Sequence, residues 1–346
     1  MTTPSQPYHN IILYTHTAYC IYRWGIRNDI DFIAASFTRK ASDVIAIRDY
    51  CRKVIKSEGL SVDTPVPRII SKIENIEALN NIDEIIAESE GIMVARGDLG
   101  VEIPMETLTN VQKDIVKKCR LAGKPVIVAT QMLESMQKNP RPTRAECTDV
   151  SNAVFDGADC VMLSGESAKG KSPVAAVQMM YNIVNESEGW ITKQRELDYE
   201  EHGTLTVHKP IVPPVTDNHM DGMASAIVRA SRSLHAQCII VLTNTGTTAI
   251  NVSKFFPDCP IVAMVPNQKV GRFLQLHRGV HPVLASKDLS NYTDVNRFDH
   301  AIDYAKQLGF CNVNDTVIVA SHETALEQLS SGISMRIAQV TEKETV

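Results

Sequence analysis

Two segments decide the fold of this chain: Ile69-Ile-Ser-Lys-Ile-Glu-Asn75 and Met93-Val-Ala-Arg-Gly-Asp-Leu-Gly100. Each is an apolar run that is typical of a buried β-strand and that ends in charged residues. Lys72 and Glu74 close the first run, and Asp98 follows the second. Carboxylates at neighbouring strand ends suit Mg²⁺, which takes one or two of them together with substrate oxygens. With the lysine beside them, they predict phosphoryl-transfer chemistry.

Strands and helices alternate around these two segments. Amphipathic stretches such as Ala41–Lys56 and Leu108–Leu121 are predicted helices, and strand-like runs lie at residues 31–37, 68–73, 91–95, 125–130 and 160–164. The runs are almost continuously apolar, which is typical of parallel strands covered on both faces. Polar residues follow the strands, as at the active-site rim of a (β/α) barrel. The pattern predicts an α/β fold, a partial (β/α)8 TIM-type barrel of about five βα units.

The character of the sequence changes after this region. Residues 190–215 are rich in charge and proline and have weak periodicity, as expected for a linker. Strands are then predicted again at residues 238–242, 260–265 and 316–320, in a C-terminal three-layer α/β domain. We therefore divide the chain into four parts: an unassigned N-terminal segment (residues 1–24), a partial barrel with the active-site residues (25–189), a linker (190–215) and the C-terminal domain (216–346).

The composition of the 346 residues argues against several function classes. The net charge is −5 and no run of Lys and Arg is present, so nucleic-acid binding is not expected. The eight cysteines form no Cys-x-x-Cys pair, which disfavours zinc and disulfides and favours a reducing cytoplasm. No apolar stretch reaches the ~20 residues of a membrane span, and residues 1–10 lack the pattern of a secretory signal. We expect a cytoplasmic protein without membrane partners.

Five segments, in order, resemble signatures of the pyruvate kinase family. The two segments quoted above resemble its lysine-and-metal strand and its second metal strand. The others are Ala129-Thr-Gln-Met-Leu-Glu-Ser135, Asn139-Pro-Arg-Pro-Thr-Arg-Ala-Glu146 and Val161-Met-Leu-Ser-Gly-Glu-Ser-Ala-Lys-Gly170. The resemblance begins near Gly25 and weakens after Pro282. It implies that phosphoenolpyruvate and ADP are converted to pyruvate and ATP, the last step of glycolysis.

The resemblance also implies roles for the residues at the first two strand ends. Glu74 and Asp98 would hold Mg²⁺ or Mn²⁺, and Lys72 would bind substrate and neutralise charge on the phosphoryl group in flight. Taken alone, a Lys-x-Glu pair such as Lys72 and Glu74 is more often a structural ion pair at a strand end, and Asp98 nearby favours the functional interpretation. A metal-dependent aldolase or lyase also places carboxylate ligands at strand ends, and these two carboxylates by themselves do not distinguish it from a kinase.

Arg96, Gly97 and Asp98 would bind substrate through backbone N–H groups that form an anion-binding nest before a short helix. The alternatives are an ordinary Gly-Asp turn and an Arg-Gly-Asp adhesion motif, which would require secretion. Thr130 would lie at the edge of the substrate. By itself, a threonine at the end of a strand is more often a helix cap.

The remaining signature residues are assigned by resemblance alone. Ser164, Glu166 and Lys169 would lie near the nucleotide and the proton-delivery network, although a polar loop with turn glycines is the plain alternative. Arg144 would reach a neighbouring subunit, which implies a homo-oligomer, a tetramer in the family. A hydroxyl-rich loop that can cradle a phosphate resembles the family's sugar-bisphosphate effector loop: Thr243, Asn244, Thr245, Gly246, Thr247 and Thr248. Glu323 and Glu327 would repel a second phosphate.

The N-terminal part departs from the family pattern. A family member has three further barrel strands, an inserted lid domain and a K⁺ site before residue 31, and none of these matches this sequence. Five βα units cannot close an eight-stranded barrel, so sheet edges would be exposed unless segments such as residues 11–14 and 19–22 cover part of them. The sequence favours an incomplete or mis-started version of an enzyme over a truncated paralogue. We expect impaired activity; the alternative is an inactive regulatory paralogue that binds a phosphorylated metabolite or full-length subunits.

Overall fold

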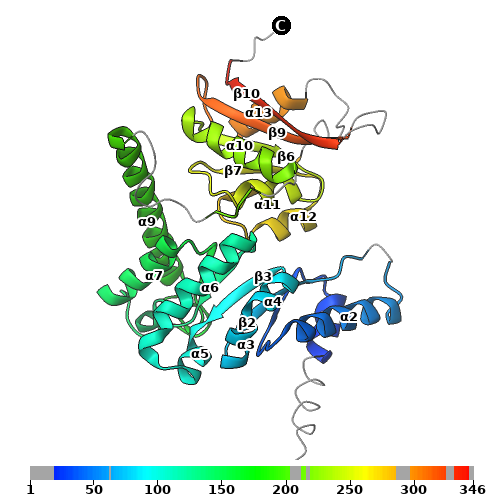
Figure 1. Ribbon diagram of the computed structural model, residues 1–346, viewed down its shortest axis with the longest axis vertical. Coiled ribbons are helices and arrows are strands. Elements are labelled where there is room, and N and C mark those ends of the chain that lie inside the picture. Colours follow the sequence, from blue (N-terminus) through cyan, green and yellow to red (C-terminus); the bar gives the residue numbers. More distant parts are fainter. Residues whose placement is uncertain are drawn as a thin grey trace, which may run out of the picture. The chain divides into compact units, whose positions relative to one another are not determined.

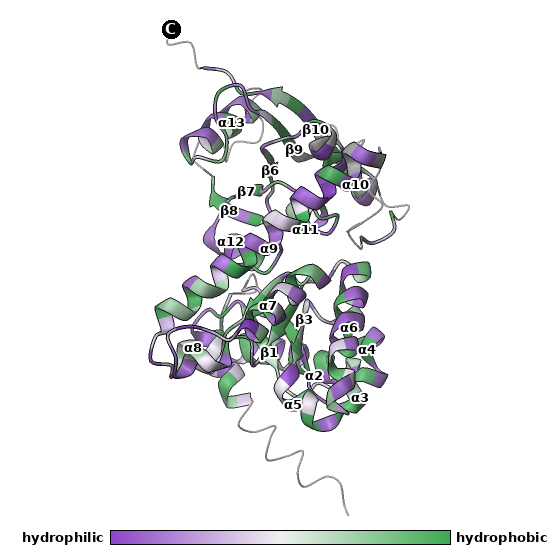
Figure 2. Cartoon of the chain, turned by 90° about the vertical axis from the view of Figure 1, so that its left-hand side faces the viewer, coloured by the Kyte–Doolittle hydropathy of each residue, from purple (hydrophilic) through white to green (hydrophobic). Residues whose placement is uncertain are grey.

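The computed structural model describes residues 19–61, 64–202, 212–215, 219–285, 297–324 and 331–342, and the chain divides into two units, Met1–Thr109 and Asn110–Val346 (Figure 1). In the first unit the parallel strands β1 (Phe32–Ala35), β2 (Arg68–Ile73) and β3 (Gly91–Ala95) lie side by side in that order. Their side chains are largely buried, as expected for parallel strands covered on both faces. Figure 2 accordingly shows β3 as mainly hydrophobic.

Helices follow each of these strands. The helices that follow the strands of the first unit are α2 (Ala41–Ser57), α3 (Ile76–Asn80), α4 (Ile82–Glu88) and α5 (Arg96–Glu102), with a 3-10 turn, η1, at Met105–Thr107. Asn75 caps α3, since its side chain accepts a hydrogen bond from Ala78 N. Because α3 begins directly after this cap, Glu74 lies between the end of β2 and the start of α3, at the carboxyl edge of the sheet.

Residues 19–27, most of which the sequence leaves unassigned, form a helix that packs on α2. Ile26 and Tyr22 belong to an apolar cluster with Cys51 and Val54 of α2. The ring of Tyr19 stacks on that of Tyr50, with centroids 4.1 Å apart. This helix therefore covers α2, while residues 11–14 lie outside the described part of the chain.

The second unit begins with barrel-type elements. Strands β4 (Val126–Ala129) and β5 (Cys160–Met162) are parallel neighbours. The helices around them are α6 (Leu108–Ala122), η2 (Glu134–Gln137), α7 (Arg144–Asp156), α8 (Gly165–Ala168) and α9 (Pro173–His202). Because α9 continues to His202, the first half of the segment predicted as a linker is helical.

The C-terminal part contains a five-stranded sheet in the order β10-β9-β6-β7-β8. Only β10 runs antiparallel to its neighbour. The strands are β6 (Cys238–Leu242), β7 (Ile261–Val265), β8 (Val280–Leu284), β9 (Thr316–Thr324) and β10 (Ser331–Gln339), and the helices are α10 (His219–Ser233), α11 (Thr247–Ser253), α12 (Gln268–Leu274) and α13 (Arg297–Gln307).

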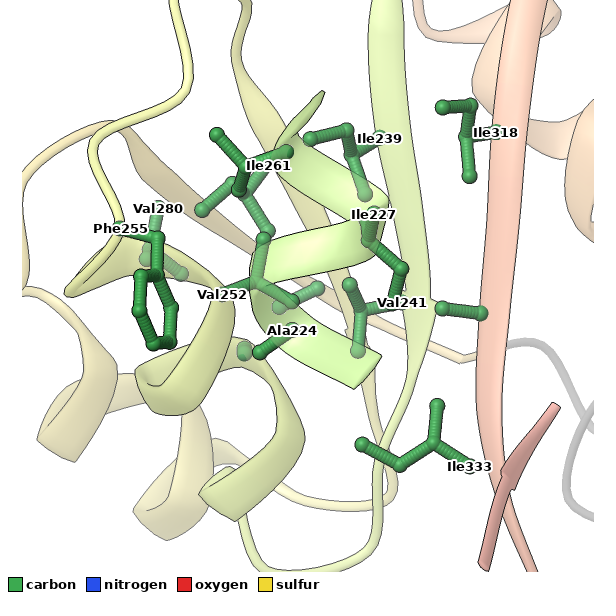
Figure 3. Close-up of a cluster of buried hydrophobic side chains, with 14 of the residues drawn as sticks. Ala224, Ile227, Ile239, Val241, Val252, Phe255, Ile261, Val280, Ile318 and Ile333 are labelled. Atoms are coloured by element: carbon green, nitrogen blue, oxygen red, sulfur yellow. The ribbon is translucent and has the colours of Figure 1, made fainter. Parts of the chain in front are cut away.

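Two apolar clusters lie on opposite faces of this sheet. One includes Ile239 and Val241 of β6 with Ile227 of α10 and Val252 of α11 (Figure 3). The other joins alternate residues of the same strands, such as Ile240, to α13. The period of two along β6 sends neighbouring side chains to opposite faces. The helix–sheet–helix arrangement confirms the predicted three-layer α/β domain. Within the described part of the chain, no helix is long and apolar enough to cross a membrane.

Gly157 ends α7 in a left-handed conformation, with φ 93°, and its oxygen accepts a hydrogen bond from Arg120 Nη1 at 3.3 Å. A Cβ there would overlap the Arg120 guanidinium. We expect Gly157→Ala to lower the free energy of unfolding by about 2–4 kcal/mol, through backbone strain and overpacking. Chemical denaturation measures the change. The matched control is Gly189→Ala in α9, where a Cβ meets open space and should stabilise the helix slightly. Equal effects of the two substitutions would contradict this explanation.

Candidate active site

Lys72 and Glu74 form an ion pair at the carboxyl end of β2. Lys72 Nζ lies 2.5 Å from Glu74 Oε1 and donates a hydrogen bond to Ser36 Oγ at 3.0 Å. The side chain of Glu74 is completely buried, whereas that of Lys72 is 23% exposed. The Lys72 ammonium group is therefore paired with a buried carboxylate, while part of the lysine side chain remains accessible to a ligand.

The other oxygen of Glu74 connects β2 to the end of β1. Glu74 Oε2 accepts a hydrogen bond from the backbone N of Phe37 at 2.5 Å. Phe37 has a φ of 53°, in the left-handed region that a bulky residue rarely adopts. The turn after β1 is thus fixed on the Glu74 carboxylate, and Ser36 is held next to Lys72.

Each oxygen of Glu74 has one partner, Lys72 Nζ or Phe37 N, and a carboxylate offers about four lone-pair sites in all. Although Oε1 is paired with Lys72, it is buried and has no hydrogen-bond partner among the described residues. The Lys72 ammonium at 2.5 Å compensates the charge of this buried oxygen, and the carboxylate keeps lone pairs for a second cation. The described residues include no group of three or more His, Cys, Asp or Glu side chains that could hold a metal by itself. Glu74 therefore fits a cation that takes one or two carboxylates and completes its coordination with substrate or water oxygens.

Asp98 and its neighbours follow β3 at the same edge. Ile73 of β2 pairs with Val94 of β3, so the carboxyl ends of the two parallel strands are level. Arg96, Gly97 and Asp98 form the first turn of α5 rather than a nest before it. Arg96 is buried and Asp98 is exposed. Asp98 is thus accessible to a ligand and follows the strand next to that of Glu74.

The second unit holds the other predicted site residues. Thr130 follows β4 with a φ of 73°, and the next residue, Gln131, is also left-handed, with a φ of 53°. Thr130 Oγ1 donates a hydrogen bond to the carbonyl of Ala129 at 2.5 Å. Positive φ in a β-branched residue is rare and strained, and such strain is concentrated at functional sites. Thr130 does not cap a helix here.

Ser164 and Glu166 lie together after β5. Glu166 is fully buried, and its two oxygens accept hydrogen bonds from Leu133 N at 3.0 Å and Ser164 N at 2.8 Å. Glu166 thereby ties the loop after β5 to the loop after β4. Lys169 is exposed at the end of α8. Glu166 therefore holds the backbone of these two loops in place. Ser164 and Lys169 are more accessible to a ligand than Glu166 is.

Glu146 is a positioning residue that sequence reasoning missed. It accepts hydrogen bonds from Ser135 N and Oγ, at 2.7 and 2.6 Å, and forms a capping box with Thr143 at the start of α7. Burial opposes its ionisation, but these hydrogen bonds outweigh burial and hold the pKa of Glu146 below its usual value. The Thr-x-x-Glu spacing of residues 143–146 is the signal that predicts such a box. Arg144, the predicted subunit contact, is exposed in the first turn of α7.

The predicted effector loop follows β6. Thr243 Oγ1 accepts a hydrogen bond from Gly246 N at 3.0 Å, and Gly246 has a φ of 87°. Thr245 and Thr247 bond to each other through their hydroxyls at 2.9 Å. Asn244, Thr245 and Thr247 are exposed, whereas Thr243 and Thr248 are buried. The side chains of Glu323 and Glu327 lie outside the described residues.

Comparison with known families identifies both parts of the chain. Residues 15–177 match the model described as pyruvate kinase, barrel domain, and residues 221–329 match the model described as pyruvate kinase, alpha/beta domain. The chain belongs to the pyruvate kinase family. The family resemblance and the fold predicted from the sequence, a partial TIM-type barrel followed by an α/β domain, are both confirmed.

Individual pyruvate kinases agree with this assignment. The chain is 44% identical to the pyruvate kinase of Clostridium acetobutylicum over 298 residues, which covers 86% of this chain and 58% of that protein. It is 43% identical to the Candida albicans pyruvate kinase over 310 residues, covering 86% and 56%. For the Hypocrea jecorina pyruvate kinase the identity is 44% over 304 residues, covering 86% and 53%. The chain thus spans little more than half the length of these relatives.

Proposed function

We propose that this chain carries the metal-binding and phosphoryl-binding part of a pyruvate kinase active site, which transfers a phosphoryl group from phosphoenolpyruvate to ADP. The observation that carries the proposal is the pairing of accessible Lys72 with buried Glu74 at the carboxyl edge of β2. Asp98 follows the neighbouring strand at the same edge. Membership of the family supports the choice of this reaction over an aldolase or lyase.

Each residue at this edge has a proposed role. Glu74 and Asp98 would hold Mg²⁺ or Mn²⁺, which when bound neutralises phosphoryl charge and orients the substrate. Lys72 Nζ, fixed by Glu74 and Ser36, would contact the phosphoryl oxygens and stabilise their charge during transfer. Because both anchors of Lys72 belong to strand ends, its ammonium is positioned before the substrate arrives. Phosphoryl transfer needs mainly such positioning and electrostatic stabilisation.

The other predicted residues complete the proposal. Arg96, Gly97 and Asp98 would bind the substrate carboxylate at the start of α5. Thr130 would lie at the edge of the substrate, and its strained backbone supports a functional role. Ser164 and Lys169 would lie near the nucleotide, with Glu166 holding the loop that carries them.

Several properties are proposed from the family alone. Arg144 would contact another subunit in a homo-oligomer, and the loop at residues 243–248 would bind one phosphate of a sugar-phosphate effector. We expect the cytoplasm as the compartment. Mg²⁺ or Mn²⁺ is the proposed cofactor, and no residue of this chain is proposed as a ligand for K⁺.

For the 346-residue polypeptide itself we expect slow turnover. A polypeptide of these 346 residues spans between 53% and 58% of the lengths of three relatives, and an assay of that polypeptide tests only the groups it contains. ATP formation from phosphoenolpyruvate and ADP, followed by luminescence, should be below the ~1 s⁻¹ typical of slow enzymes. Turnover at or above that rate would contradict the expected impairment. ATP formation of equal rate in Lys72→Met would instead contradict the proposed site.

A further inference from the structure

Thr130 and Gln131 form a strained turn directly after β4. Their backbones are left-handed, with φ of 73° and 53°, and a β-branched residue such as threonine rarely adopts this conformation. Ala129 is fully buried on one side of the turn, and Met132 and Leu133 are fully buried on the other. A strained conformation persists only where its surroundings fix it. The contacts of the segment that follows the turn therefore determine whether Thr130 keeps this backbone.

Two carboxylates hold that segment by hydrogen bonds. Glu166 of α8 accepts one from Leu133 N at 3.0 Å. Glu146, in the first turn of α7, accepts two from Ser135: Oε1 from the backbone N at 2.7 Å and Oε2 from the hydroxyl at 2.6 Å. We refer to the two bonds between Glu146 and Ser135 as the Glu146 clamp. The segment after the turn is thus fixed from two different helices.

The start of α7 fixes the side chain of Glu146 in turn. Glu146 Oε2 also accepts hydrogen bonds from Thr143 N at 2.7 Å and from Thr143 Oγ1 at 3.0 Å. Four donors therefore meet this carboxylate, which is about the number of its lone-pair sites. The side chain cannot rotate without breaking several of these bonds. Glu146 thus transmits the position of α7 to Ser135.

We propose that Glu146 is a positioning residue for the proposed phosphoryl transfer, which acts through Ser135 to keep Thr130 in its strained conformation at the edge of the substrate. The inference rests on the proposed function, because that function gives Thr130 a substrate. Glu146 itself touches no substrate in this role. When the Glu146 clamp is broken, the turn can relax to an unstrained backbone, and the Thr130 hydroxyl then loses its fixed position.

The charge of Glu146 makes the clamp strong. The residue is half-buried, and although burial opposes ionisation, the hydrogen bonds from Ser135 and Thr143 hold the pKa of Glu146 below its usual value. The carboxylate is therefore charged at neutral pH. A hydrogen bond to a charged group changes a local equilibrium by about tenfold or more. Glu146→Gln keeps the size of the side chain but replaces one acceptor oxygen with an amide group that donates.

Hydrogen exchange of the ligand-free chain at neutral pH, followed by mass spectrometry, tests the clamp directly. The amides of Leu133, Ser135 and Met136 donate hydrogen bonds, so their exchange reports opening of this segment. In Glu146→Gln these amides should exchange at least about tenfold faster than in the wild type. Ser135→Ala, which removes the hydroxyl bond and keeps the backbone bond, should raise exchange at the same amides by a smaller factor.

Two controls separate the clamp from loss of charge and from simple capping of α7. Glu134→Gln removes an exposed carboxylate from the residue before Ser135, and exchange should remain as in the wild type. Thr143→Ala removes the hydroxyl that accepts a hydrogen bond from Glu146 N but leaves both bonds to Ser135. Exchange should then rise in the first turn of α7 and stay near the wild-type rate in residues 133–136. The same pattern in Glu146→Gln would make Glu146 a helix cap alone and would overturn the proposal.

A comparison of turnover with metal binding tests the catalytic part of the inference. In Glu146→Gln, ATP formation at saturating phosphoenolpyruvate should fall at least about tenfold, because a small misplacement of a positioned group is costly, while Mn²⁺ affinity should stay within about twofold of the wild type. The metal is assigned to Glu74 and Asp98, which the clamp does not contact. Equal losses of turnover and Mn²⁺ affinity would indicate general destabilisation and would overturn the proposal.

The exchange data distinguish failure of the clamp from failure of the proposed function. If the wild type forms no ATP at all, the proposed function fails, and with it the catalytic part of this inference. Exchange then decides the clamp alone: a tenfold increase in Glu146→Gln supports it, and unchanged exchange in both Glu146→Gln and Ser135→Ala refutes it. If Glu146→Gln does not yield folded protein, Ser135→Ala and Thr143→Ala decide by the same comparison.

Discussion

Lys72→Met is expected to lower the rate of phosphoryl transfer by at least about a thousandfold. The substitution removes the cation that would meet the phosphoryl oxygens, and a single positioned positive group contributes about 10³–10⁵ in such reactions. Lys72 is also held on two sides, by Glu74 Oε1 at 2.5 Å and Ser36 Oγ at 3.0 Å, so a solvent cation cannot replace it in the same geometry. A luminescence assay for ATP at high enzyme concentration measures the change.

Two further variants separate catalysis from folding. Lys72→Met leaves the buried Glu74 carboxylate without its cation, so its thermal unfolding must be compared with that of the wild type. Lys72→Arg keeps a positive charge beside Glu74 but replaces the ammonium with a planar guanidinium group. Its thermal stability should therefore be closer to that of the wild type than its activity is. Lys53→Met, on the exposed face of α2, is the surface control. Loss of activity smaller than tenfold in folded Lys72→Met would refute the role of Lys72.

Glu74→Gln is expected to weaken Mn²⁺ binding at least about a hundredfold. Residues that merely support metal ligands typically contribute about 10–100-fold to affinity, and an anionic ligand should contribute at least as much. Glutamine can still accept the hydrogen bond from Phe37 N, so the turn after β1 should persist. Electron paramagnetic resonance of free Mn²⁺ during a titration measures the affinity.

The matched control for this variant is Glu77→Gln, which removes an exposed carboxylate from the first turn of α3, three residues away. Its Mn²⁺ affinity should equal that of the wild type. Asp98→Asn, like Glu74→Gln, should weaken Mn²⁺ binding. Equal affinities for wild type, Glu74→Gln and Asp98→Asn would show that the metal binds elsewhere.

The sequence predicted central strands well because their apolar runs are bounded by polar residues. The bounds of β2, β3 and β6 agree with those expected, and the helices over residues 41–56 and 108–121 differ by one residue at their ends. These elements lie within packed layers, where burial dictates the pattern.

Edge elements were missed for identifiable reasons. Strand β8 contains Pro282, which interrupts a strand pattern but is tolerated where one edge of the strand is unpaired. Strand β10 is the antiparallel edge strand at the other side of that sheet. The charged end of α9, from Trp190 to His202, resembles a linker in composition although it is helical.

The positions of the candidate site residues at strand ends were predictable, but their detailed geometry was not. The strand-end positions of Lys72 and Glu74 follow from the sequence, and in the structure the two side chains form an ion pair, which the sequence gives as the structural alternative to a functional role. The left-handed backbone of Thr130 and the two backbone bonds of Glu166 could not be predicted, because they depend on loops that meet only in the fold. The Glu146 capping box was readable from its spacing and was overlooked.

Metal-dependent binding of phosphoenolpyruvate is the property that tests the proposed site most directly, because it needs no turnover. Calorimetric titration of the chain with phosphoenolpyruvate, with and without Mn²⁺, should show affinity at least about tenfold higher with the metal, a difference of about 1.4 kcal/mol. Glu74→Gln should remove that difference, and Glu77→Gln should retain it. Binding that is independent of Mn²⁺, or equal in the wild type and Glu74→Gln, would contradict a pyruvate kinase metal site at the end of β2.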